Sequence, residues 1–230
     1  MNGISIVIPC FNESRRITKT FVMLNQDIKE LGNLFRHYEI VFVNDGSKDN
    51  TLNLLNSFGE NKNTTIKVVS YPMNSGKGYA VKRGLLASKY FTKIILDADY
   101  SIRLSEIAKI PSWENWVIIK GRRRQVLKQP FHRRMVGRAW HFLVLTLAGI
   151  EADSQAPFTL LQLPRQFYKN LEVKGFAFDV EIIYKLQRMH YFIYEHPVDY
   201  YDAQGSKVSL KKSIKMFFDI LRIVKEKKKK

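Results

Sequence analysis

Residues 41–51, VFVNDGSKDNT, join an apolar run to a cluster of Asn, Asp, Gly and Ser. The run from Ile40 to Val43 is β-branched or aromatic and predicts a buried strand, which the polar cluster ends in a tight turn. Asn44 and Asp45 then lie at the carboxyl end of a strand, the edge at which open α/β sheets bind ligands. Asp and Gly are also ordinary turn residues, so this stretch alone fits either a ligand site or a plain turn.

The first half of the chain repeats this alternation of apolar runs and polar turns. Strands that alternate with helices predict an α/β fold with a mostly parallel sheet flanked by helices. Strands are expected at 5–9, 39–43, 65–71, 93–99 and 116–121, and helices from 12 or 14 to 31, from about 49, and after the glycine-rich turn that begins at 74. Beyond 121 we expect a helix that ends near 150, a helix at 178–189, a strand at 191–200 and a final basic helix.

Length and composition fit one globular domain with an appendage. The 230 residues are 45% apolar, which is enough for a core. The single cysteine, Cys10, excludes a disulfide framework and a cysteine metal site. We recognise no signal peptide, and the longest mostly apolar run, 142–150, is far shorter than the roughly 20 residues that span a bilayer. We therefore expect a cytoplasmic protein, with a globular domain at 1–207 and a basic amphipathic helix and tail at 208–230.

The positive charge of the chain is concentrated in its second half. The formal net charge is +17, of which residues 1–100 carry +4 and residues 101–230 carry +13. The segment from Lys120 to Arg138 alone holds eight Lys and Arg and no acid. Such an excess suggests a polyanionic partner, which could be a nucleic acid, an anionic membrane or a phosphorylated substrate.

Asp97 and Asp99 stand two apart in the sequence LDAD, at the end of an expected strand. Two carboxylates this close repel each other unless a cation lies between them. Mg²⁺ and Mn²⁺ take carboxylate together with phosphate oxygens, so the pair predicts a metal–diphosphate site. A surface turn with two acids is the alternative.

The stretch 74–84, NSGKGYAVKRG, has the glycines of a phosphate loop but not the spacing of a Walker motif. We expect its glycines to allow a close backbone approach and Lys77 to lie near an anion. A plain strand–helix turn would have the same composition.

Four of these motifs share an order and a spacing. SIVIPCFNES, EIVFVNDGSKDNT, NSGKGYAVKRG and LDAD resemble the inverting family 2 glycosyltransferases, which have the GT-A fold. In the second half, DSQAPFTLL, FAFDVEIIYKL and HPVDYYDAQGSK are similar to motifs of the polyprenyl-phosphate glycosyltransferases, and nearest to the dolichyl-phosphate β-glucosyltransferases. The resemblance covers roughly residues 4 to 210.

The resemblance implies roles for individual positions. It implies that a divalent ion, Mg²⁺ or Mn²⁺, binds Asp97 and Asp99, with Asp99 the stronger ligand. It implies phosphate and acceptor contacts at Arg123, at Lys207, and at one of Arg133, Arg134 and Arg138. It places the nucleotide sugar against Pro9, Phe11, Glu13, Val43, Asp45, Lys77, Asp97 and Ala98.

The implied reaction is the transfer of a hexose to dolichyl or another polyprenyl phosphate, with glucose from UDP-glucose first and mannose from GDP-mannose as the alternative. The acceptor phosphate is already an anion at pH 7 and needs little help from a base. It does need cations to approach a second polyanion, and the 120–138 segment would supply them. Asp153, Asp179 and Glu181 are candidates for a base or a sugar-orienting carboxylate, although Asp179 could instead cap the helix that it begins.

The sequence departs from the family pattern at three places. Asn44 stands where an Asp is usual, Pro157 alters the loop before Phe158, and Ser101 stands where some mannosyl relatives have Gln. A rival reading takes 131–142, FHRRMVGRAWHF, as a nucleic-acid-binding stretch. Because that reading leaves the LDAD and VNDGS motifs unexplained, no nucleic-acid partner is expected.

The last helix is expected to be amphipathic. Its apolar residues recur at steps of four and three, and Lys and Arg take the rest of its surface. We expect peripheral attachment to an anionic membrane on the cytoplasmic face. Packing of the same stripe on the core and docking onto an integral membrane protein are the alternatives. The expected stripe is Leu210, Ile214, Phe217, Leu221 and Val224, widened by Phe218, Ile220 and Ile223.

Overall fold

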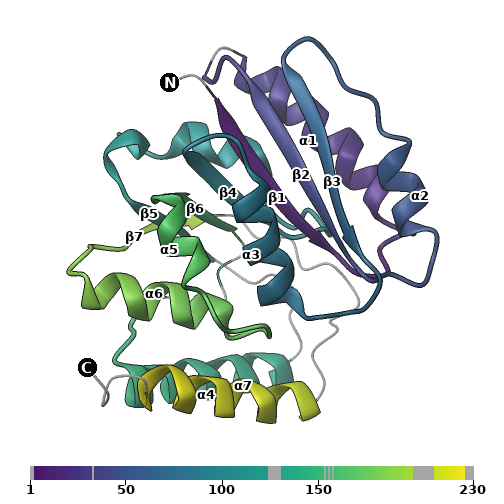
Figure 1. Cartoon of the computed structure of the whole chain (residues 1–230). Coiled ribbons are helices and arrows are strands. Elements are labelled where there is room, and N and C mark those ends of the chain that lie inside the picture. The colour runs from purple at the N-terminus through teal and green to yellow at the C-terminus, as the bar shows by residue number, and fades with distance from the viewer. Residues whose placement is uncertain are drawn as a thin grey trace.

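The structure, a computed structural model, describes residues 3–32, 34–123, 131–152, 154, 156, 158–198 and 210–225. Across these residues a sheet of seven strands runs in the order β3-β2-β1-β4-β6-β5-β7, with helices on both faces (Figure 1). The predicted α/β fold with a mostly parallel, helix-flanked sheet is confirmed.

The strands of the first half are all parallel. They are β1 (Ile4–Cys10), β2 (Tyr38–Asp45), β3 (Thr64–Tyr71) and β4 (Thr92–Leu96). The second half adds β6 (Phe158–Gln162), antiparallel to β4, and then β5 (Ile118–Arg123) and β7 (Tyr194–Val198), which run parallel to each other. The sheet is therefore mixed on the side built by the second half.

Helices connect the strands in nearly the predicted order. They are α1 (Ile17–Leu31), α2 (Thr51–Asn56), α3 (Lys77–Ala87), α4 (Phe131–Ala148), α5 (Arg165–Lys169), α6 (Phe178–Arg188) and α7 (Leu210–Lys225). Two short 3₁₀ helices, η1 (Leu104–Lys109) and η2 (Trp113–Asn115), and α5 were not predicted.

Two hydrophobic cores lie on opposite faces of the sheet. Successive side chains of a strand point to opposite faces, and in β2 Ile40 and Phe42 join the core under α1 while Val41 and Val43 join the core under α3. Figure 1 shows α3 in front of the sheet and α1 behind it. A central parallel strand is buried on both faces, which is why its sequence is an unbroken apolar run.

Several predicted boundaries were wrong. β2 continues to Asp45 and does not end at Val43, and β5 covers Ile118–Arg123 and not 116–121. β4 ends at Leu96, so Asp97 to Asp99 lie in a turn beyond the strand and not within it. α1 begins at Ile17, because the residues before it bond to a neighbouring turn. β7 begins only at Tyr194.

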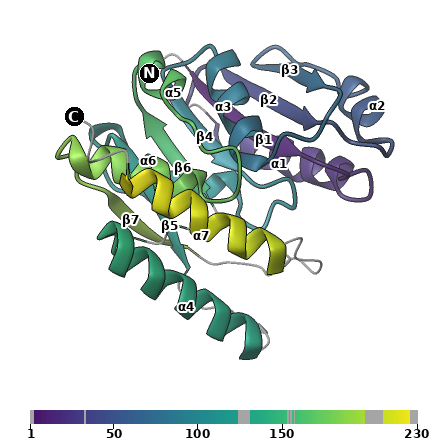
Figure 2. The same ribbon diagram turned by 60° about the horizontal axis from the view of Figure 1, so that its bottom comes forward.

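α4 and α7 pack against each other and form one end of the molecule (Figures 1 and 2). The buried row of α7 is Met216, Ile220 and Ile223, one step away from the centre of the predicted stripe. Within the described residues, none of the helices combines the length and apolar character that crossing a membrane requires.

Candidate functional site

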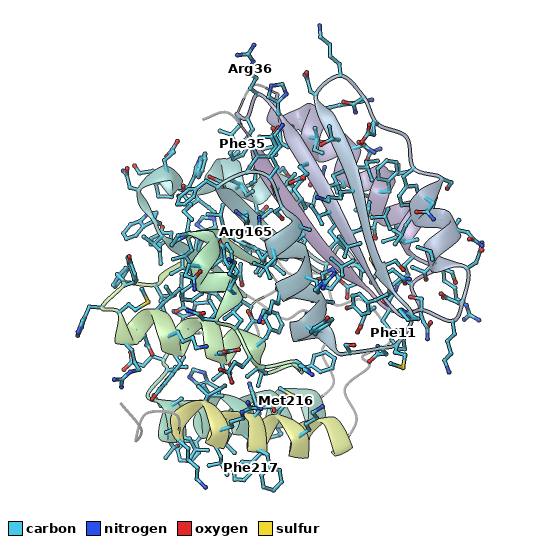
Figure 3. The ribbon with its side chains drawn as sticks, in the orientation of Figure 1. Phe11, Phe35, Arg36, Arg165, Met216 and Phe217 are labelled. Carbon is cyan, nitrogen blue, oxygen red and sulfur yellow. The ribbon has the colours of Figure 1, made fainter. Side chains whose placement is uncertain are left out.

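The carboxyl ends of β1, β2 and β4 meet at one edge of the sheet. β1 lies between β2 and β4, and all three strands are parallel. The chain crosses from one side of β1 to the other at this point, which is where open α/β sheets form their ligand crevice. Phe11 lies at this edge, directly after β1 (Figure 3).

The loop after β1 is bonded to the turn after β2. The N–H of Asn12, whose φ of 53° lies in the left-handed region, donates to Ser47 Oγ (2.9 Å), and the Lys48 N–H donates to Asn12 Oδ1 (2.8 Å). The Glu13 N–H donates to Thr51 Oγ1 (2.8 Å). These hydrogen bonds hold the loop after β1 and the turn after β2 together, and both segments were expected to contact the nucleotide.

Asp45 is buried and holds the glycine turn. Its two carboxylate oxygens accept the backbone N–H groups of Ser75 (2.7 Å) and Gly76 (3.0 Å). Each oxygen can still accept a second hydrogen bond, so the ribose contact implied for Asp45 stays a prediction. Val43 is fully buried in the core under α3, and its implied contact with the base stays a prediction.

The glycine turn approaches another segment of the protein. A Cβ on Gly78 would lie 2.3 Å from the Val173 carbonyl oxygen, and the Gly78 N–H donates to the Gly175 carbonyl (3.1 Å). The φ of Gly76, 100°, is one that residues with a side chain rarely adopt. The predicted close backbone approach is present, and its partner is the loop 173–175.

Lys77, at the start of α3, forms an ion pair with Asp97 (Nζ to Oδ1, 2.6 Å). Burial acts to lower the pKa of this ammonium, but the carboxylates of Asp97, Asp179 and Asp99 outweigh burial and hold the pKa above its ordinary value. Burial and the charge of Asp97 raise the pKa of Asp99. The turn therefore holds two carboxylates whose mutual repulsion a cation relieves.

The donor set fits a divalent ion such as Mg²⁺ or Mn²⁺. Asp97 and Asp99 offer only oxygen ligands, which these ions prefer. Burial first, and then the neighbouring Asp97 carboxylate, raise the pKa of Asp99, and a bound cation would offset the second of these effects. Over the residues described, no cluster of three or more His, Cys, Asp or Glu is present, so the other ligands of such an ion would be water and phosphate oxygens.

A second ion pair lies behind the first. Lys120 is fully buried, and its Nζ donates to Asp179 Oδ1 (2.7 Å) and to Thr159 Oγ1 (2.9 Å). Asp179 does not cap α6, contrary to one alternative above, because it lies inside the helix and the cap position is Ala177. Lys120 was expected among the cations of the 120–138 segment that meet the acceptor phosphate, whereas in the structure it is fully buried and paired with Asp179. The signal for a buried position was that this Lys lies in the apolar run WVIIKG.

Glu181 supports the loop that receives the glycine turn. Its buried carboxylate accepts the N–H groups of Glu172 (2.8 Å) and Val173 (2.9 Å) and an Nζ hydrogen of Lys185 (2.5 Å). These contacts favour a structural part for Glu181 over a part in the chemistry.

The remaining expected residues divide into two groups. The first group lies among the described residues and is at least half-buried. Ala98 is buried and its carbonyl accepts a hydrogen bond from the Thr20 hydroxyl (2.7 Å), and Glu13 is buried and forms an ion pair with Arg16 (2.7 Å). Pro9 is half-buried. Asp153 and Lys207, and the side chains of Arg123, Arg133, Arg134 and Arg138, lie outside what the structure describes.

Comparison with solved structures supports the fold. Glucosyl-3-phosphoglycerate synthase from Mycobacterium tuberculosis in complex with UDP superposes with a TM-score of 0.68 at 18% identity, over 97% of this chain and 79% of that one. The same enzyme in complex with Mn²⁺, UDP and glucosyl-3-phosphoglycerate gives a TM-score of 0.66 at 17% identity, over 96% and 78%.

Sequence comparison identifies the family. The dolichyl-phosphate β-glucosyltransferase of Dictyostelium discoideum is 32% identical over 96% of this chain and 73% of that protein. The enzyme of the same name from Saccharomyces cerevisiae is 29% identical over 96% and 73%. The model of glycosyl transferase family 2 matches residues 5–141, more than half of the chain. This chain is therefore a glycosyltransferase and belongs to glycosyltransferase family 2.

Proposed function

We propose that this enzyme transfers glucose from UDP-glucose to dolichyl or another polyprenyl phosphate and inverts the anomeric centre. The observation that carries the proposal is the 32% identity with the Dictyostelium enzyme across 96% of the chain. A match of that extent includes the second-half motifs as well as the nucleotide-binding half. A structural neighbour crystallised with Mn²⁺, UDP-glucose and phosphoglyceric acid supports the same donor class.

In this proposal the first-half residues bind the donor. The nucleotide lies along the edge formed by the loop after β1 and the turn after β2, where Phe11 is half-exposed. Asp97 and Asp99 hold a divalent ion, which neutralises the diphosphate leaving group when it is bound. The Lys77 ammonium, 2.6 Å from Asp97, adds a second positive charge at the same place.

The acceptor phosphate is the nucleophile. One of its oxygens forms a bond to the anomeric carbon as the bond from that carbon to the UDP oxygen breaks, so UDP leaves and an α-linked donor gives a β-linked product. Because the acceptor is already ionised, no side chain has to remove a proton. Asp179, which pairs with Lys120, is therefore not required as a base. Arg123, Lys207 and the arginines at 133, 134 and 138 are the proposed cations for this phosphate.

The insoluble tail of such an acceptor places the reaction at a membrane. We propose that the protein acts as a peripheral protein on the cytoplasmic face, bound to anionic lipid. An integral membrane partner is the alternative means of attachment.

The test is a donor screen. Purified protein is incubated with polyprenyl phosphate in detergent, Mg²⁺ or Mn²⁺, and either UDP-glucose or GDP-mannose, and the lipid product is identified by mass. We expect polyprenyl phosphate glucose as the product, formed from UDP-glucose only when the divalent ion is present. A mannosyl product would reassign the donor, and no lipid-linked sugar from either donor would overturn the proposal.

A further inference from the structure

α4 carries an apolar row, and α7 a pair of adjacent phenylalanines, that lie outside the two cores. On α4, Val144 is buried, whereas Met135, Phe142 and Leu145 are 51%, 68% and 39% exposed. These three residues stand seven and three apart, which places them on one face of the helix. Large apolar side chains that share an exposed helix face indicate an interaction surface.

On α7 the inner row is Met216, Ile220 and Ile223, and Phe218 is 62% exposed. Figure 3 shows Met216 on the side of α7 toward the domain and Phe217 on the opposite side. The two helices lie side by side at the end of the molecule (Figure 2). We name their outer surface the α4–α7 face and define it by Met135, Phe142, Leu145, Phe217 and Phe218.

The charge around the α4–α7 face is positive. α4 contains no Asp or Glu, and the only acid of α7 is Asp219. Asp219 points inward, since its Oδ2 is buried and lies 3.0 Å from the position of a Cβ on Gly175. Lys215, Arg222 and Lys225 are exposed on α7. Exposed aromatic side chains beside basic ones, with no exposed acid on either helix, are typical of helices that lie in the headgroup layer of a membrane.

We propose that the α4–α7 face docks on the surface of a bilayer that contains anionic lipid. A second copy of the chain would bring two positively charged faces together and be repelled. A nucleic acid would match the charge and could stack bases on the phenylalanines, but it offers no apolar environment to Met135 and Leu145. An anionic bilayer accepts both the apolar row and the cations. The proposal deepens the proposed function, because a polyprenyl phosphate acceptor is available only at such a surface.

The α4–α7 face is connected to the candidate site by a short series of contacts. Arg222 of α7 pairs with Glu172 (3.0 Å), and Asp219 packs against Gly175. The Gly175 carbonyl accepts the N–H of Gly78, next to Lys77. Docking through α4 and α7 would therefore hold the carboxylate pair of the site close to the lipid surface from which the acceptor phosphate must come.

The test is co-sedimentation of the full chain with vesicles of phosphatidylcholine alone or mixed with phosphatidylserine. Wild type is expected to bind the mixed vesicles at low salt and to be released as salt screens the charges. The variant Phe142→Gln/Phe218→Gln should bind at least about tenfold more weakly, since each Phe would lose its burial in lipid. The control is Phe91→Gln, because Phe91 is similarly exposed (59%) but precedes β4 at the opposite edge of the sheet.

Two outcomes would overturn the docking proposal. One is wild type that stays in the supernatant with mixed vesicles at low salt. The other is equal binding of wild type and the double variant, with unchanged melting temperatures to show that both are folded. A third outcome would assign the α4–α7 face to a second copy of the chain instead. In that case wild type does not bind vesicles but self-associates in sedimentation velocity, and the double variant does not self-associate.

A parallel assay separates this proposal from the proposed function. A short-chain, water-soluble polyprenyl phosphate needs no membrane, so the double variant should transfer glucose to it at the wild-type rate. If wild type binds vesicles but transfers glucose neither to the soluble acceptor nor to a membrane-bound polyprenyl phosphate, the docking of the α4–α7 face is supported and the proposed function is wrong. If wild type uses the soluble acceptor but does not bind vesicles, the docking face fails alone.

Discussion

The buried pair of Lys120 and Asp179 is expected to make Lys120→Met strongly destabilising. The Lys120 ammonium is fully buried and lies 2.7 Å from Asp179 Oδ1. Without it, the Asp179 carboxylate, itself 7% exposed, keeps the Thr159 hydroxyl at 3.4 Å and the charge of the Lys77 ammonium, and among the described residues no other cation donates a hydrogen bond to it. Removing one partner of a buried ion pair costs about 3–5 kcal/mol. Methionine fills nearly the same volume, so little of that loss would come from a cavity.

Urea denaturation of wild type and Lys120→Met measures this difference directly. A loss of about 3–5 kcal/mol in the free energy of unfolding corresponds to a melting temperature lower by roughly 6–20 °C for a domain of this size. The compensated variant Lys120→Met/Asp179→Leu removes both charges and should regain most of the loss. The surface control is Lys109→Met, because the Lys109 side chain is 61% exposed and its pair with Glu106 should contribute no more than about 1 kcal/mol.

The reasoning fails if Lys120→Met unfolds within about 1 kcal/mol of wild type. It also fails if the compensated variant is no more stable than the single one, because the cost would then come from packing and not from the unpaired carboxylate.

Four further variants test other groups of the site and core. The pKa of Asp99 is higher in the folded than in the unfolded protein, so the ionised carboxylate opposes folding, and the free energy of unfolding falls as pH rises from the unfolded to the folded pKa. Asp99→Asn removes this ionised carboxylate and should therefore melt at a higher temperature than wild type at pH 7. The same variant should lose metal-dependent transfer. Burial lowers the pKa of Lys93 from 10.5 to about 8, so the stability of wild type relative to Lys93→Met should rise between those two values in urea titrations at stepped pH. Arg123→Ala and Lys207→Ala should each slow transfer to polyprenyl phosphate about tenfold to a hundredfold and leave the melting temperature unchanged. Transfer at the wild-type rate would remove both residues from the phosphate site.

The sequence predicted best where one local pattern decides the structure. Ile40 to Val43 are apolar on both faces, and only a central strand or a buried helix explains such a run. The polar cluster at 44–50 then fixes the end of the strand, because Gly46 adopts a φ of 63°. The turn after β2 and the edge it lies on followed from these residues alone.

Boundaries were missed where distant contacts override the local pattern. The alternation in KIILDAD continues that of the strand, but Tyr100 adopts a φ of 51° and its N–H donates to the Asp97 carbonyl (3.0 Å), which makes a turn. The Tyr100 hydroxyl donates to the buried Asp27 of α1 (2.7 Å). No local pattern in the sequence predicts that Tyr100 bonds to Asp27, which lies 73 positions earlier in the chain.

The orientation of α7 was missed for a different reason. The helix has two neighbouring apolar rows, and periodicity shows that both exist without showing which one the core takes. The core buries the row of Met216, Ile220 and Ile223 and leaves Phe218 in solvent. Only the packing partners, α4 and α6, decide between the two rows.

The contacts between the glycine turn and the loop 173–175 explain why the second half of the chain matters for a site built mainly by the first. Asp45 holds the turn from one side and the carbonyls of Lys174 and Gly175 hold it from the other. The turn is therefore fixed at both sides, and Lys77 begins α3 at a fixed place beside Asp97. A long lysine side chain loses rotamer entropy when it binds an anion, and part of that loss has already occurred here on folding. Because α6 holds the loop 173–175 through Glu181 and α7 holds the residue before it through the Arg222–Glu172 ion pair, these two helices also contribute to the geometry of the charged groups at the sheet edge.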